Sequence, residues 1–190
     1  YNAAPSQNLP VVRLDRDGRR ELALLRWGLI PSWARDPAIG YRTINAKAET
    51  VAEKPAFRAA FRKRRCLVPA DGFYEWQKID GGKQPWRITL KDGAPFAFAG
   101  LWEHWDKGGE PVESFTIITT TANALCAEID DRMPVIIGPA DYEAWLAAAD
   151  TAIPQALLQP YPAETMAAYP VGTRVNSPKN DDAQLIERAS

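Results

Sequence analysis

The chain has 190 residues, of which 46% are hydrophobic and 25% are charged, and its 23 basic residues nearly balance its 24 acidic residues. This hydrophobic content excludes a disordered chain, and a chain of this length can bury one core without disulfides. No apolar run approaches the roughly 18 to 20 residues that span a bilayer, and no signal peptide is visible. We therefore expect a single domain over residues 1–190 that is cytoplasmic, monomeric and not bound to a membrane.

The near-neutral total hides an uneven distribution of charge. Residues 1–102 carry 18 basic and 10 acidic side chains, whereas residues 103–190 carry 5 basic and 14 acidic ones. Six of the seven tryptophans lie between Trp27 and Trp105, where most of the cations also lie. Cations that contact phosphates and indoles that stack on unpaired bases are typical of single-stranded nucleic-acid binding, although core packing explains many tryptophans equally well.

The first half of the chain begins with a hairpin pattern. Two β-favouring segments, residues 11–15 and 21–27, flank the turn signal Asp17-Gly18. Prolines then interrupt the pattern over residues 31–40. The composition of residues 50–65 favours a helix, and its C-terminal part is the densest basic run of the chain.

Short β-favouring segments separated by glycine turns follow and predict an antiparallel meander. These strands are expected at residues 66–69, 73–76, 86–90, 95–102 and 114–120. Two helices are expected after them, one at 141–148 with Asp141 as its N-cap and a shorter one at 153–158, and residues 166–171 return to the sheet. The predicted class is α+β, with a strand-rich core and peripheral helices.

The residue types that usually act as nucleophiles or metal ligands give little evidence for a catalytic or metal site. The only histidine, His104, lies at the end of a predicted strand, and Cys66 and Cys126 lie in apolar surroundings, so structural roles are expected for all three. No C-x-x-C, P-loop or nucleophile-elbow motif is present. The acids in residues 129–134 leave metal ligation open, but a salt-bridged turn is favoured. No metal and no cofactor are expected.

Glu75 is a candidate for proton transfer. In the predicted strand, Phe73 and Glu75 share one face, while Tyr74 and Trp76 share the other. A carboxyl group between two aromatic residues just after a turn is partly desolvated, which raises its pKa into a useful range. The alternative is a strand glutamate that faces solvent or pairs with an arginine.

Five motifs resemble, in order, those of the SRAP family, the SOS-response-associated peptidases that shield abasic sites. They are residues 27–33 (WGLIPSW), 44–50 (INAKAET), 64–76 (RRCLVPADGFYEW), 131–134 (DRMP) and 175–180 (VNSPKN). The opening residues 1–5 (YNAAP) resemble the segment that follows the family's first helix. The resemblance covers essentially the whole chain and implies a β-rich, pseudo-symmetric fold with a barrel-like core, without the family's N-terminal segment.

The family resemblance also implies a function. It implies binding of single-stranded DNA, a nucleoid-associated location, and capture of the ring-opened aldehyde of an abasic site. In the family, removal of Met exposes an N-terminal Cys whose amine and thiol condense with the aldehyde to give a thiazolidine. Such intramolecular ring closure has a large proximity advantage. That Cys would lie upstream of Tyr1.

The resemblance assigns roles to residues of this sequence. Glu75 matches the catalytic glutamate and Asn45 a pocket asparagine, while Thr119 falls where a pocket threonine is expected. The positions matched to DNA binding are Trp33, Tyr41, Lys47, Trp76 and Arg132. Lys47 stands where the family usually has Arg, so it keeps the charge and loses the bidentate fork. We expect a confined basic groove with few phosphate contacts.

One departure keeps a second function open. The family's His before the DRMP motif is Asp130 here, so the resemblance gives Asp130 a catalytic position. An aspartate can accept a hydrogen bond and, if its pKa is raised, move a proton, but near pH 7 it is usually anionic and does not mimic an imidazolium. The alternative to a crosslinking sensor is therefore a non-catalytic single-stranded DNA-binding paralogue. Proteolysis of other proteins has less support, because the only peptidase step that the family implies is removal of the protein's own Met.

Overall fold

A ring of strands forms the larger part of the computed structural model, which describes residues 1–107, 109–147 and 155–189. The ring runs through β1 (Asn8–Leu14), β2 (Arg20–Trp27), β8 (Val112–Thr121), β7 (Phe96–Trp105) and β4 (Arg65–Ala70), and β4 closes it by pairing with β1. Three short strands extend the same sheet: β3 (Asn45–Lys47), β9 (Arg132–Pro134) and β10 (Ile136–Ile137). This ring is the strand-rich core that the sequence predicts.

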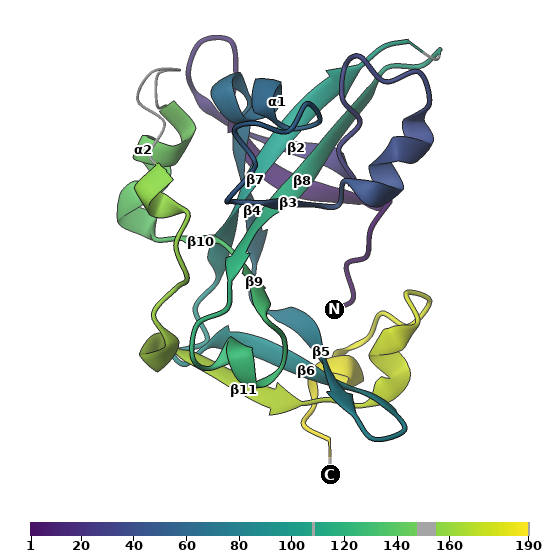
Figure 1. The fold of residues 1–190 in the computed structure, drawn as a ribbon, viewed down its shortest axis with the longest axis vertical. Coiled ribbons are helices and arrows are strands. Elements are labelled where there is room, and N and C mark those ends of the chain that lie inside the picture. The colour runs from purple at the N-terminus through teal and green to yellow at the C-terminus, as the bar shows by residue number, and fades with distance from the viewer. Residues whose placement is uncertain (108, 148–154, 190) are drawn as a thin grey trace.

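A separate three-stranded sheet lies below the ring in Figure 1. It contains β5 (Phe73–Ile79), β6 (Gly82–Leu90) and β11 (Met166–Pro170), in the order β11, β6, β5. The predicted simple meander is therefore wrong. Strand β7 pairs with β4 and β8 rather than with β6, and β8 runs parallel to both β2 and β3. The predicted last strand exists, but it joins the smaller sheet.

The helices are shorter than predicted. Of the helix expected over residues 50–65, only α1 (Arg58–Lys63) forms, and turns precede it. Pro55 explains the late start, because a proline disfavours helical geometry in the residue before it. The second α-helix, α2, spans Tyr142–Ala147. Asp141 is the last residue of the 3-10 turn before α2, and no capping hydrogen bond from its side chain is recorded among the described residues. Ala148 and residues 153–154 of the predicted helices lie outside the described residues.

Single 3-10 turns connect many of these elements. They are η1 (Pro37–Arg42), η2 (Cys126–Glu128), η3 (Pro139–Asp141), η4 (Gln155–Leu157), η5 (Ala163–Thr165), η6 (Thr173–Asn176) and η7 (Ala183–Ile186). Within the described ranges, no helix combines the length and the apolar character needed to cross a membrane.

The basic run before β4 is partly structural. Arg65 is buried and donates hydrogen bonds to the carbonyls of Phe61, Arg62 and Trp145. Its neighbour Arg64 lies 2.6 Å from the buried carboxylate of Glu103. These two cations hold α1 and α2 against the ring, so they do not form part of an exposed basic face.

The loop after β2 is fixed by two glycines. Gly28 has a φ of 122°, a conformation that favours glycine, and a Cβ built on it would lie 2.6 Å from the carbonyl oxygen of Gly40. Close approach of these two backbones folds the segment that includes η1 back onto the end of β2. The segment that carries Trp33 and Tyr41 is thereby attached to the ring.

Candidate functional site

A groove of about 1010 Å³ lies between the ring and the three-stranded sheet. We call it the central groove. Polar and aromatic side chains from distant parts of the sequence line it, among them Asn45, Lys47, Glu75, Trp76, Thr119, Asp130 and Arg132. Seven of the nine residues predicted as catalytic or DNA-binding therefore meet in one place. Tyr1 also lines the groove, and Figure 1 shows the N-terminal end of the described chain between the two sheets.

The parallel pairing of β3 with β8 brings three of these residues together. Its register places Asn45 beside Ile117 and Lys47 beside Thr119. Asn45 and Lys47 are exposed on one face of β3, while Ala46 between them is buried on the other. The indole nitrogen of Trp27 donates a 2.9 Å hydrogen bond to the carbonyl of Ile44, which fixes the start of β3. The motif that contains Trp27 therefore positions the motif that contains Asn45.

The guanidinium of Arg132 is already paired. Its two terminal nitrogens lie 2.6 and 3.0 Å from the two carboxylate oxygens of Glu49, a bidentate contact. One of these nitrogens also donates to the carbonyl of Thr119 at 2.7 Å and approaches its hydroxyl at 3.3 Å. The ion pair holds the pKa of Glu49 below its ordinary value, mainly through the hydrogen bond from Arg132. Sequence reasoning missed Glu49, which lies in the turn after β3.

Asp130 begins the turn that leads into β9. Its Oδ1 accepts a 3.0 Å hydrogen bond from the main-chain N–H of Arg132, as an aspartate at the start of a turn commonly does. Among the described residues, no group of three or more His, Cys, Asp or Glu side chains is arranged to hold a metal ion. Asp130 thus serves a turn, as the favoured prediction for residues 129–134 expects. The salt bridge of that prediction is different, because the recorded ion pair of Arg132 is with Glu49, outside this segment.

Glu75 is half-buried in the central groove. Burial raises its pKa above the ordinary value, and the negative charge of Asp130 adds to that rise. A 3.2 Å hydrogen bond from the main-chain N–H of Trp76 and the positive charge of Lys83 act in the opposite direction. Partial desolvation of a carboxyl group beside a second acid is an arrangement suited to proton transfer.

The aromatic neighbours of Glu75 face both sides of β5. Phe73 packs edge-on against Phe98 of the ring, with ring centroids 5.8 Å apart. On the other face, the hydroxyl of Tyr74 donates a 2.8 Å hydrogen bond to the carbonyl of Tyr1. The alternation predicted for residues 73–76 is therefore present: Phe73 faces the ring, and Tyr74 faces the N-terminal segment.

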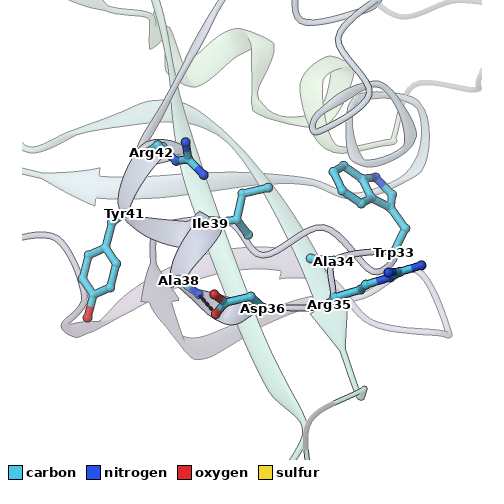
Figure 2. Close-up of a pocket in the computed structure, with 8 residues that line it drawn as sticks. All are labelled: Trp33, Ala34, Arg35, Asp36, Ala38, Ile39, Tyr41 and Arg42. Atoms are coloured by element: carbon cyan, nitrogen blue, oxygen red, sulfur yellow. Dashed lines mark hydrogen bonds between the residues drawn. The ribbon is translucent and has the colours of Figure 1, made fainter.

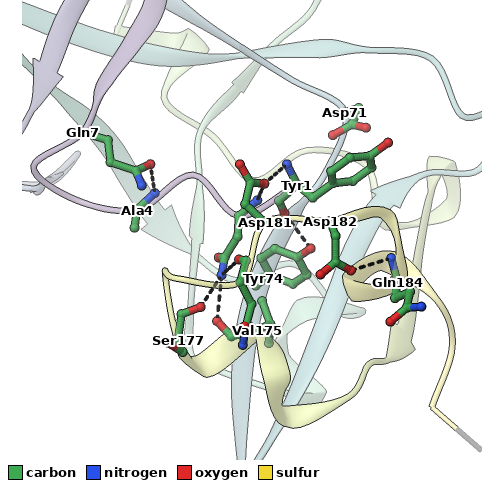
Figure 3. Close-up of polar contacts among 12 residues, drawn as sticks. Tyr1, Ala4, Gln7, Asp71, Tyr74, Val175, Ser177, Asp181, Asp182 and Gln184 are labelled. Atoms are coloured by element: carbon green, nitrogen blue, oxygen red, sulfur yellow. Dashed lines mark hydrogen bonds and ion pairs between the residues drawn. The ribbon is translucent and has the colours of Figure 1, made fainter.

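The C-terminal segment covers one end of the groove. Figure 3 shows the polar contacts near Tyr74 that join the start of the described chain to residues 175–181. The side-chain amide of the buried Asn2 donates to the carbonyls of Val175, Ser177 and Asn180, at 3.1 Å each. The main-chain nitrogen of Tyr1 donates to Asp181 at 2.7 Å. This network explains why the motif at residues 175–180 belongs to the site although it supplies few of its functional side chains.

The prediction that the groove is basic is wrong, because acids outnumber cations among the residues that line it. The charged residues that line the groove are two cations, Lys47 and Arg132, and three acids, Asp71, Glu75 and Asp130. The cationic excess of residues 1–102 lies mostly outside this groove. The counts in the sequence could not reveal this, because folding places acids of both halves beside the two cations.

Trp33 and Tyr41 lie outside the central groove. They line a shallow depression of about 610 Å³ on the segment that contains η1, together with Arg35 and Arg42. Figure 2 shows the two rings at opposite ends of this depression. Trp33 is 51% exposed and Tyr41 is 64% exposed, although the Trp33 indole nitrogen donates to the carbonyl of Pro55 at 3.2 Å. Two exposed aromatic rings beside arginines offer stacking surfaces, separate from the residues around Glu75.

The cysteines have the structural roles expected of them. Both Cys66 and Cys126 are unpaired and buried. Burial raises the pKa of the Cys66 thiol and raises that of Cys126 to about 11, so neither is a thiolate near neutral pH. His104 is exposed in β7 and does not line the central groove.

Comparison with known proteins agrees with this arrangement. The abasic site processing protein YoqW of Bacillus subtilis is 51% identical over 98% of this chain and 85% of its own length. The abasic site processing protein HMCES of Gallus gallus is 35% identical over 98% of this chain and 65% of its own length. A crystal structure of a protein from Bacteroides thetaiotaomicron has the same fold, with a TM-score of 0.86 and 36% identity over 97% of this chain and 82% of that one.

The family assignment follows from these findings together. The relatives match nearly the whole chain, and the structural match covers both the ring and the smaller sheet that enclose the central groove. The profile of the SOS response associated peptidase (SRAP) family matches residues 1–178. The chain belongs to the SRAP family.

Proposed function

We propose that this protein processes abasic sites in single-stranded DNA and forms a covalent crosslink to them through an N-terminal Cys that precedes Tyr1 in the full-length protein. The observation that carries the proposal is the meeting of Asn45, Glu75 and Thr119 in one groove that Tyr1 also lines. Chain that precedes Tyr1 would thus start at the groove that holds Glu75. The names of the relatives, abasic site processing proteins, support the substrate class.

The chemistry needs an amine, a thiol and a group that moves protons. The amine of the N-terminal Cys adds to the aldehyde of the opened sugar to give a carbinolamine. Loss of water from the carbinolamine gives an imine, and addition of the thiol to the imine carbon closes the thiazolidine, so that one water is released overall. Protonated Glu75 would donate a proton to the departing hydroxyl and take one back from the thiol.

The pKa of Glu75 suits this role. A carboxyl group with a raised pKa keeps its proton closer to neutral pH, where the amine must also be partly unprotonated in order to attack. Asn45 is exposed on the groove side of β3 and would orient the sugar or the amine through its side-chain amide. Lys47 would contact a phosphate of the bound strand.

The test is covalent capture by the full-length protein. It is incubated with a single strand that contains one abasic site, boiled in SDS and run on a denaturing gel. A shifted band is expected with the aldehyde-bearing site, and no band is expected with a tetrahydrofuran analogue that cannot open. Glu75→Gln should slow formation of the band. Absence of the band with the natural protein would exclude the crosslinking proposal.

The aspartate at position 130 favours a second candidate. Because Asp130 stands where the family has its catalytic His, a DNA-binding paralogue without crosslinking is the alternative function. That paralogue would bind single strands in a salt-sensitive manner, would give no covalent band, and would be unaffected by Glu75→Gln. Trp33→Ala would weaken its binding.

A further inference from the structure

We infer that Glu49 is a specificity-determining residue that competes with DNA phosphate for Arg132 and so weakens binding to ordinary single-stranded DNA. The inference rests on the proposed function, since it concerns how the same groove treats DNA without a lesion. It starts from the bidentate pairing of Arg132 with Glu49 at 2.6 and 3.0 Å. The two terminal nitrogens of a guanidinium form an end-on fork for carboxylate or phosphate, and here a carboxylate of the protein occupies it.

The remaining donors of Arg132 cannot replace that fork. The nitrogen nearer to Thr119 uses both of its hydrogens, one toward Glu49 and one toward the Thr119 carbonyl at 2.7 Å. The Nε atom is buried and has no hydrogen-bond partner within the part of the chain that the structure describes. A phosphate therefore reaches Arg132 through a single hydrogen, or it must displace the carboxylate.

Displacement of Glu49 is feasible. The Glu49 side chain is 47% exposed, so it can swing into solvent when an anion arrives, whereas the Arg132 side chain is 23% exposed and is held by Thr119. An ion pair with such an exposed partner stabilises by about 0.2–1 kcal/mol, which corresponds to roughly 1.4- to 5-fold in a binding constant. The competition is thus strong enough to lower affinity for any phosphate and weak enough for a tightly held substrate to overcome.

The competition for Arg132 matters for DNA affinity because few cations line the groove. Lys47 is the other cation that lines it, and no ion pair of Lys47 is recorded among the described residues. With Arg132 occupied, a passing single strand meets one available cation beside three acids. Affinity for undamaged DNA stays low, while an abasic site gains a covalent bond that does not depend on this contact.

The experiment measures binding of an undamaged single-stranded oligonucleotide by fluorescence anisotropy across a salt series, with the full-length protein. Glu49→Gln should bind about two- to fivefold more tightly than the natural protein, with a steeper dependence on salt. Glu53→Gln is the matched control, since Glu53 is an exposed acid four residues away with no recorded ion pair among the described residues. It should leave the affinity within twofold.

A double-mutant cycle separates competition at Arg132 from a general effect of charge. In an Arg132→Gln background, Glu49→Gln should no longer tighten binding. If the gain persists in that background, or if Glu49→Gln binds no more tightly than the natural protein, the inference is wrong. Crosslinking to abasic DNA is measured in parallel. A natural protein that crosslinks while Glu49→Gln shows no gain overturns only the inference, whereas a protein that neither binds nor crosslinks overturns the proposed function as well.

Discussion

The indole nitrogen of Trp76 donates a 2.7 Å hydrogen bond to Oδ1 of Asn176, a residue 100 positions further along the chain. Both residues line the central groove. The bond connects the strand that carries Glu75 with the C-terminal segment that covers one end of the groove. Two sequence motifs whose residues lie 100 positions apart are therefore coupled at the candidate site.

This contact predicts a measurable coupling. Trp76→Phe keeps an aromatic ring and removes the donor, and Asn176→Ala removes the acceptor. Each change should lower the free energy of unfolding by about 0.5–1.5 kcal/mol, the usual net value of a hydrogen bond. Urea denaturation of the two single variants and the double variant measures the coupling. Additive losses would show that the bond does not contribute to stability.

The paired glycines after β2 predict a difference between two otherwise similar substitutions. Gly18→Ala introduces only the backbone cost of a positive φ, 77°, because nothing lies within 4 Å of a Cβ there. It should cost about 1 kcal/mol. Gly28→Ala adds a contact at 2.6 Å with the Gly40 carbonyl, so we expect a loss of about 3 kcal/mol. Equal losses for the two variants in urea denaturation would contradict this assignment.

The raised pKa of Glu75 predicts that this carboxyl group lowers stability at neutral pH. In the folded protein it keeps its proton to a higher pH than in the unfolded chain, mainly because it is buried. Stability therefore falls as the pH rises from the ordinary glutamate value through the raised folded value. The Glu75→Gln side chain cannot ionise. The melting temperature of the variant minus that of the natural protein should therefore be larger at pH 7 than at pH 4. A difference that does not change with pH would contradict the raised pKa.

Asp130 contributes to that raised pKa and thus to the pH dependence of crosslinking. Asp130→Asn keeps an oxygen that accepts the hydrogen bond from the Arg132 N–H and removes the charge beside Glu75. The pKa of Glu75 should fall, and loss of its protonated form should begin at lower pH. The alkaline limb of the rate of crosslinking against pH should therefore move to lower pH. An unchanged profile would indicate that Asp130 does not act on Glu75 in catalysis.

Local patterns in the sequence predicted local structure well. The Asp17-Gly18 turn forms as expected, because Asp15 accepts 2.8 Å hydrogen bonds from the N–H groups of Asp17 and Arg19. The alternation of residues 73–76 also holds. The pairing of distant strands was not predictable in this way, since the parallel contacts of β8 with β2 and β3 depend on long-range packing rather than on turn residues.

The sequence predicted which residues meet in the central groove better than it predicted the balance of charge there. Motif resemblance found seven of the residues that line the central groove, and it could not place Trp33 and Tyr41 relative to them. Glu49 escaped notice because a single exposed glutamate carries no signal until its partner is known. The partner, Arg132, lies 83 positions away in β9, and the pairing of β9 with β8 places it beside Glu49.

Peptide mass spectrometry of the crosslink tests the central claim most directly. The full-length protein is reacted with abasic single-stranded DNA without a reducing agent, digested with protease and nuclease, and the modified peptide is sequenced. We predict that the adduct lies on the N-terminal Cys and that its mass equals that of peptide plus sugar remnant minus one water. An adduct on Lys47 or another lysine, or one found only after borohydride reduction, would contradict the thiazolidine account.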